Sequence, residues 1–355
     1  MAKNNNLTDF LTDVANAIRE KDGSTGTINP QDFSDKIKAI QTGVDTSDGN
    51  IEPATVLKGY KGYAKGVAIN GAIETYDGSY EDIVVYDDCI TFTGETSEFT
   101  LKATNKAWDG TLEWSTDHTN WITLAGTEAM QSVGKKLYLR GKGNTKFDSS
   151  NGIRWQLSAR AGCSGNIQTL LDWENPPTSI SAWYCYEDMF RGCTLLTSAP
   201  SLPATTLTGS CYSSMFYGCT SLTTPPELPA TTLAKNCYSS MFYGCTSLTT
   251  PPELPATTLK EYCYFHMFEG CTSLTQAPEL PATTLAKSCY DYMFKGCTSL
   301  KISTVQSTEY PTAWRIPSSG RISSVAPDWN YYMLAGTGGT FTGDPNINTT
   351  YYGAW

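Results

Sequence analysis

Cysteines are the most regularly spaced residues in this 355-residue chain that could carry out chemistry. The chain has 12 of them, and ten form pairs eight residues apart, from Cys185 and Cys193 to Cys289 and Cys297. This spacing is not typical of zinc ligands, and only two histidines, His118 and His266, could complete such a site. We therefore expect no metal.

A disulfide within one pair is also not expected. Eight residues of helix separate the two Cα atoms by about 12 Å, whereas a disulfide requires less than about 7 Å. Free cysteine packs as a small apolar residue. We expect these thiols to be buried and stacked on the equivalent thiols of neighbouring copies, with disulfides between successive copies as the alternative.

Other catalytic motifs are missing from the sequence. It contains no nucleophile elbow, phosphate-binding loop, dinucleotide fingerprint or His/carboxylate metal motif. The adjacent carboxylates Asp87 and Asp88 would point to opposite faces of a strand, so they could not flank a glycosidic bond together. His118 lies in a predicted turn and is interpreted as a loop residue. We expect no enzymatic activity and no cofactor.

The cysteine pairs belong to a repeat with a period of 26 residues. The segment Cys211–Leu222 recurs at Cys237, and imperfect copies begin at Cys185, Cys263 and Cys289. A fixed period of this size indicates a stacked repeat array in which neighbouring units complete one another's core. Cys, Met and Cys at i, i+4 and i+8 predict a short helix in each unit. The Leu-Pro-Ala-Thr-Thr-Leu segment that follows predicts a short strand.

These elements predict a multidomain α+β protein. Seven short alternating segments between residues 81 and 162 are typical of a β-sandwich. The aromatic-rich end after Leu300 lacks the repeat. The expected organisation is an N-terminal helical segment (1–43), a linker with a glycine-punctuated β module (44–80), a β-sandwich (81–162), a leucine-rich repeat solenoid with a helix and a short strand per 26 residues (163–302), and a β-rich C-terminal cap (303–355).

The N-terminal segment is expected to be a helical hairpin. Apolar residues follow helical spacing in both halves, and two short helices bury little surface alone, so they need self-association or a docking partner. The Asn70-Gly71 pair predicts a hairpin turn between Val67–Ile69 and Ala72-Ile73. The candidate attachment and oligomerisation residues are Leu7, Phe10, Leu11, Val14, Ile18, Phe33, Ile37 and Ile40.

The formal charge of −10 argues against nucleic acid as a partner. No run of apolar residues is long enough to span a membrane, and the first residues lack the apolar region of a signal peptide. We therefore expect that the protein does not insert into a membrane. We also expect that it is assembled inside the cell that makes it.

The repeat motif Cys-x3-Met-Phe-x-Gly-Cys-x-Ser-Leu resembles the BspA-type leucine-rich repeats of bacterial surface proteins and phage fibre proteins. The glycine-punctuated module, and the Leu-Thr-Asp-x-Leu run before it, resemble N-terminal segments of phage tail and fibre proteins. The resemblance implies a structural protein of a phage virion, a tail fibre or similar appendage. Such a protein would be homotrimeric, attached to other virion proteins through its N-terminus and exposed on the particle. A capsid head fibre or decoration protein and a bacterial cell-surface adhesin are the alternatives.

Adhesion or receptor binding would use positions that vary within the constant repeat frame. These are the residue after Phe and the two residues before Met, which solvent exposure alone would also leave free to vary. The aromatic C-terminus could bind a sugar or a protein of the host surface, or plug the last repeat. The candidate host-contact residues are Tyr217, Tyr243, His266, Tyr292, Trp314, Trp329, Tyr331 and Tyr332.

Overall fold

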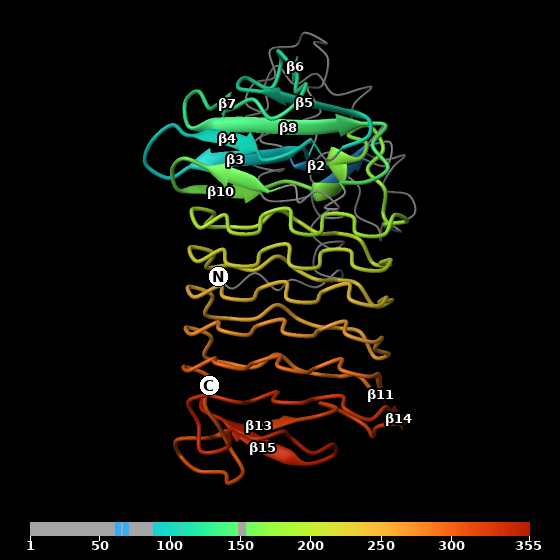
Figure 1. Ribbon diagram of the computed structural model, residues 1–355, viewed down its shortest axis with the longest axis vertical. Coiled ribbons are helices and arrows are strands. Elements are labelled where there is room, and N and C mark those ends of the chain that lie inside the picture. The colour runs from blue at the N-terminus through green and yellow to red at the C-terminus, as the bar shows by residue number, and fades with distance from the viewer. Residues whose placement is uncertain (1–60, 65–66, 71–87, 107, 148–153) are drawn as a thin grey trace, which may run out of the picture. The chain divides into compact units, whose positions relative to one another are not determined.

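The computed structural model describes residues 61–64, 67–70, 88–106, 108–147 and 154–355 (Figure 1). Within these ranges the chain forms short strands, turns and one 3-10 helix, η2 (Ile167–Leu170), and no α-helix. The predicted α+β class is therefore wrong for the described part, which is predominantly β. Asp87 and the N-terminal candidates Leu7, Phe10, Leu11, Val14, Ile18, Phe33, Ile37 and Ile40 lie outside the described residues.

The glycine-punctuated segment contains a pair of antiparallel strands. Strand β2 (Val67–Asn70) pairs antiparallel with β1 (Lys61–Ala64), and Tyr63 lies opposite Ala68. The predicted partner strand Ala72-Ile73 lies outside the described residues.

Strands are confirmed in the described part of the alternating region 81–162, where they form two antiparallel sheets. Their apolar residues alternate with exposed ones, as in β3, where Ile90 and Phe92 are buried and Thr93 is exposed. One sheet has the order β10-β3-β8-β5-β6, and the other has the order β7-β4-β9. Their strands are β3 (Ile90–Gly94), β4 (Thr100–Ala103), β5 (Thr111–Ser115), β6 (Ile122–Thr123), β7 (Met130–Gln131), β8 (Lys136–Lys142), β9 (Trp155–Leu157) and β10 (Ala161–Ser164).

The repeats are stacked, as predicted, but each repeat is a flat rung of turns and contains no helix (Figure 1). In the second rung, Ser210, Tyr212 and Ser214 have φ angles of 58°, 59° and 52°. A right-handed helix requires negative φ at every residue, so this alternation excludes one. The helix-plus-strand solenoid predicted for residues 163–302 is therefore wrong.

Hydrogen bonds explain why residues spaced four apart predicted a helix that the structure does not contain. Met215 N donates to Tyr212 O three residues earlier, at 3.2 Å, while the next residue, Phe216, donates its N–H to Met241 O of the following rung at 3.0 Å. The three-residue bonds compact the chain, so Cys211, Met215 and Cys219 still share a buried side. A spacing of four residues is thus compatible with this rung as well as with a helix.

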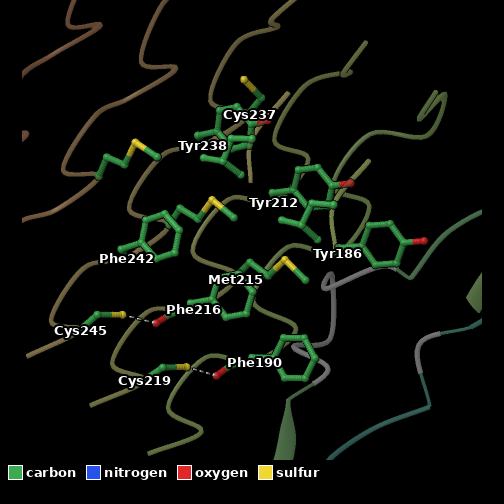
Figure 2. Packing of buried hydrophobic residues seen from close by; sticks show 14 of the residues in the cluster. Tyr186, Phe190, Tyr212, Met215, Phe216, Cys219, Cys237, Tyr238, Phe242 and Cys245 are labelled. Carbon is green, nitrogen blue, oxygen red and sulfur yellow. Dashed lines mark hydrogen bonds between the residues drawn. The ribbon is translucent and has the colours of Figure 1, made fainter. Parts of the chain in front are cut away.

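The same rung-to-rung bond recurs at every repeat. Phe190, Phe216, Phe242 and Phe268 each donate an N–H to the Met carbonyl of the next rung, at 2.8 to 3.0 Å. Side chains stack with the same period, and ring centroids of successive phenylalanines lie 5.5 to 5.7 Å apart. Figure 2 shows this phenylalanine column beside a second column of buried tyrosines that begins with Tyr186.

The predicted strand in each repeat is reduced to one or two residues. Thr206 and Thr232 form an isolated parallel bridge, as do Thr258 and Thr284. The last of this series is β11 (Thr284–Leu285), which pairs parallel with β14 (Ser324–Val325).

A sixth rung lies within residues 329–337, where the sequence predicted none. Phe294 N donates to Met333 O at 3.0 Å, and Gly296 N donates to Ala335 O at 2.8 Å, as in the earlier rungs. Gly336 has the positive φ of 75° found in the equivalent glycines. The expectation that the repeat ends at Leu300 is therefore wrong. The intervening chain adds β12 (Ile302–Ser303) and β13 (Thr312–Arg315), which pair antiparallel with β15 (Thr350–Gly353).

Replacement of Met333 by alanine tests the sixth rung. Met333 has no exposed surface, so Met333→Ala should lower the free energy of unfolding by about 2–5 kcal/mol, as in other buried Met-to-Ala changes. Urea denaturation followed by circular dichroism measures this. Val305→Ala, at a position that is 67% exposed, is the control and should change it by less than about 0.5 kcal/mol. Equal effects of the two substitutions would contradict the sixth rung.

Candidate functional site

The variable positions of successive rungs form one continuous surface, which we call the tyrosine face. The repeated hydrogen bonds hold the rungs in register, so equivalent side chains lie above one another. One column consists of the residues after Phe, and the other of the residues before Met. The tyrosine face comprises Arg191, Tyr217, Tyr243, Glu269 and Lys295 in the first column, and Asp188, Ser214, Ser240, His266, Tyr292 and Tyr332 in the second.

Aromatic rings stack along this face. The Tyr217 and Tyr243 centroids lie 4.4 Å apart with an angle of 1° between the rings, and His266 and Tyr292 lie 4.4 Å apart at 4°. The Arg191 guanidinium lies 4.2 Å from the Tyr217 ring centroid. These four rings are half-buried, and one face of each packs against its stacked partner. This arrangement favours hydrogen bonding to a partner over stacking of a sugar on a free ring face.

Charged groups on the face are paired. Glu269, which is 8% exposed, accepts from Lys295 Nζ at 3.0 Å and contacts His266 Nδ1. The hydrogen bond to Glu269 raises the pKa of Lys295. Partial burial, and then the negative charge of Glu269, raise the pKa of Tyr243. Tyr243 therefore carries a neutral hydroxyl that can both donate and accept at neutral pH.

The C-terminal candidates separate into exposed and buried residues. Tyr331 and Tyr332 are 49% and 48% exposed, with ring centroids 4.1 Å apart. Hydrogen bonding to Tyr332 raises the pKa of Tyr331 to about 12. Trp329 is half-buried, and its ring centroid lies 6.1 Å from that of Tyr290. Trp314 is buried, and its Nε1 donates to Pro278 O at 3.1 Å, so it belongs to the core and not to the contact surface.

All 12 cysteines are buried and none forms a disulfide, as the packing interpretation predicted. Cys219 and Cys245 donate their thiol hydrogens to Phe190 O and Phe216 O of the preceding rung, at 3.0 and 3.1 Å (Figure 2). Burial raises the pKa of Cys193 to about 11 and that of Cys237 to about 12. Since the thiolate is the reactive form, these thiols are structural groups at neutral pH.

His118, interpreted from the sequence as a loop residue, lies in a turn with a φ of 65°. Its Nε2 is 3.3 Å from Cys89 Sγ, and its ring centroid lies 4.7 Å from that of Tyr138, with the rings edge to face. Among the described residues, no group of three His, Cys, Asp or Glu side chains could hold a metal ion. No helix in that part of the chain is long and apolar enough to cross a membrane.

Comparison with known proteins adds no assignment: no family model, no curated protein and no solved structure matches this chain.

Of the eight predicted contact residues, the structure places Tyr217, Tyr243, His266, Tyr292 and Tyr332 on the tyrosine face. Arg191, Glu269 and Lys295 were not among the single candidate residues, but they occupy the position after Phe that the sequence assigned to the contact surface. Together with Asp188 and His266 they form the ion pairs of this surface.

Proposed function

We propose that this chain is a structural protein of a phage virion that binds the host surface through the tyrosine face. The observation that carries the proposal is the continuous register of this face over six rungs. A surface of this kind presents many weak contacts in fixed order, which suits adhesion to an extended surface. Attachment to the particle through residues 1–43 is part of the same proposal and rests on the sequence resemblance.

The rigidity of the frame supports this role. Phe190, Phe216 and Phe242 are fully buried beneath the face, and each rung is bonded to the next through its backbone. Binding groups on a rigid frame lose little conformational entropy when a partner is bound. The two columns of the face differ between repeats, while the Cys, Met and Phe positions that are buried in each of the five repeats stay constant.

The chemistry of the face favours a polar partner. It carries tyrosine hydroxyls, one histidine and paired charges, with the apolar ring faces engaged in stacking. Tyrosine is enriched in protein interfaces for this combination of area and hydrogen bonding. A host-surface glycan or a polar protein surface meets these requirements.

Loss of the stacked tyrosine pair tests the proposal. The Tyr217→Ala/Tyr243→Ala double variant should weaken binding of the purified chain to host cells by about tenfold or more, because hot-spot aromatics each contribute about 2 kcal/mol. A pull-down of labelled protein with host cells measures this, and competition with phage adsorption confirms that the same receptor is used.

The matched control is Glu227→Ala/Glu253→Ala, at two exposed residues of the same two repeats that lie outside the tyrosine face. Both double variants should retain the circular dichroism spectrum of the parent chain. Unchanged cell binding by the tyrosine variant, or an equal loss in the control, would refute the proposal.

A further inference from the structure

The sixth rung borders a solvent-open cavity next to the tyrosine face, because Tyr331, which lines it, contacts the rings of Tyr292 and Tyr332. The cavity has a volume of about 430 Å³ and is lined by residues 325–331, Asp344 and Ile347. This is within the range of small-molecule sites, about 300–1,000 Å³. It lies where the chain that leads into the sixth rung meets the segment that follows it.

The walls combine aromatic and aliphatic surface. Trp329 packs against Tyr290 on one side and lines the cavity, and the Tyr331 ring is half exposed. Val325 and Ile347 add aliphatic surface. Aromatic rings attract cations to their faces, and the aliphatic groups suit a ligand that carries hydrocarbon.

The polar groups at this cavity are predominantly acidic. Asp328 and Asp344 line it, and among the described residues no Lys, Arg or His nitrogen lies within 4.0 Å of either carboxylate. Asp291, which is 6% exposed, lies beneath and accepts from the Tyr331 N–H at 2.7 Å. Burial raises the pKa of Asp291, and the charges of Asp328 and Asp344 raise it further. The cavity therefore has a negative electrostatic potential.

We propose that this cavity binds an ammonium group carried on a small organic ligand. Trp329 and Tyr331 would contact the cation through their rings, and Asp328 and Asp344 would balance its charge. A neutral ligand would gain nothing from the two negative charges, and an anion would be repelled. The inference deepens the proposed function, because an ammonium group on a host-surface molecule would be recognised at the last rung.

A pair of probes that differ only in charge tests this. Choline is compared, by isothermal titration calorimetry on the full chain, with its uncharged carbon isostere, in which a tert-butyl group replaces the trimethylammonium group. Choline should bind at least about tenfold more tightly, because only its positive charge is attracted by the nearby carboxylates. Equal affinities, or no binding of choline, glucosamine or lysine, would overturn the proposal. The relative affinities of those three compounds identify which source of the ammonium group fits.

Variants locate the site. Asp328→Asn should weaken binding about fivefold to tenfold through loss of one charge, and Tyr331→Ala should weaken it by a similar factor through loss of the ring contact. Asp344 also accepts from Met333 N at 3.0 Å, so Asp328→Asn is the cleaner change. The control Glu309→Gln removes one charge from an exposed residue outside the cavity. If Asp328→Asn behaves like this control, the site is refuted. No cells are present in this assay, so its failure is distinct from failure of host binding.

Discussion

The folded protein is expected to unfold cooperatively as the pH rises from about 9 to 11. Free cysteine ionises near pH 8.5 in an unfolded chain. Burial raises the pKa of Cys193 to about 11, and that of Cys237 and Cys289 to about 12. Burial also raises the pKa of other repeat thiols, including Cys263.

The sign of the effect follows from proton binding. Below about pH 8.5 the thiols are protonated in both states, so their contribution to stability is fully present. Above that pH the unfolded chain loses protons that the folded chain retains, and the free energy of unfolding falls until the folded pKa is reached. Each such thiol lowers it by about 1.4 kcal/mol per pH unit. Total stability is typically about 5–15 kcal/mol, so a few thiols are sufficient to unfold the chain.

Circular dichroism and thiolate absorbance, recorded together over a pH titration, measure this transition. Both signals should change at the same pH, because ionisation requires unfolding. The Cys237→Ala/Cys263→Ala variant lacks two of these thiols. Once the difference in stability at pH 7 is allowed for, it should unfold at a higher pH than the parent chain. Thiolate absorbance that appears near pH 9 while the circular dichroism spectrum is unchanged would show that the thiols are accessible in the folded chain, contrary to their burial.

Phe242→Ala is expected to lower the free energy of unfolding by about 3–5 kcal/mol, as other buried Phe-to-Ala changes do. Phe242 has no exposed surface and lies in the middle of its column, 5.7 Å from the Phe216 ring and 5.6 Å from the Phe268 ring. Its removal leaves a cavity that interrupts packing on both sides. Since each repeat is stabilised by its neighbours, the rungs on either side should lose stability as well.

The adjacent residue provides the control. Tyr243→Ala removes a side chain of similar size that is partly exposed on the tyrosine face, and should cost about 1 kcal/mol. Urea denaturation measures both variants, and hydrogen exchange of the rung amides shows whether the loss extends to the neighbouring rungs. A similar loss in free energy of unfolding for the two variants would contradict the phenylalanine column as the main source of stability.

The sequence was sufficient to predict which residues are buried, because burial follows chemical type and a fixed period. Cys219, Met215 and Phe216 were assigned to the core from their types and their recurrence, and they are buried. It was not sufficient to predict the backbone, because a spacing of four residues arises both in a helix and in a rung of alternating φ. The decisive signal, the hydrogen bond from Phe216 to Met241, is a contact between repeats that no local pattern reveals.

The sixth rung was missed for a different reason. It follows the fifth after 40 residues and not 26, and Trp329 and Thr337 replace the two cysteines. A search for Tyr-Met-x-x-Gly, present at Tyr292–Gly296 and Tyr332–Gly336, would have found it. The tyrosine face was partly predictable, since variation within a constant frame identifies exposed positions. The stacking of Tyr217 on Tyr243 was not, because it depends on the register of the rungs.

Residues 211–233 and 237–259 have identical sequences and occupy consecutive rungs. In both rungs the Phe N–H donates to the Met carbonyl of the following rung and the Gly N–H donates to the residue after the next Phe, so one unit can follow another with these bonds preserved. Near-identical coding segments in tandem are prone to unequal recombination, which would add or remove whole units. Lineages of this protein should therefore differ in length by multiples of 26 residues, each multiple adding or removing one rung of the stack.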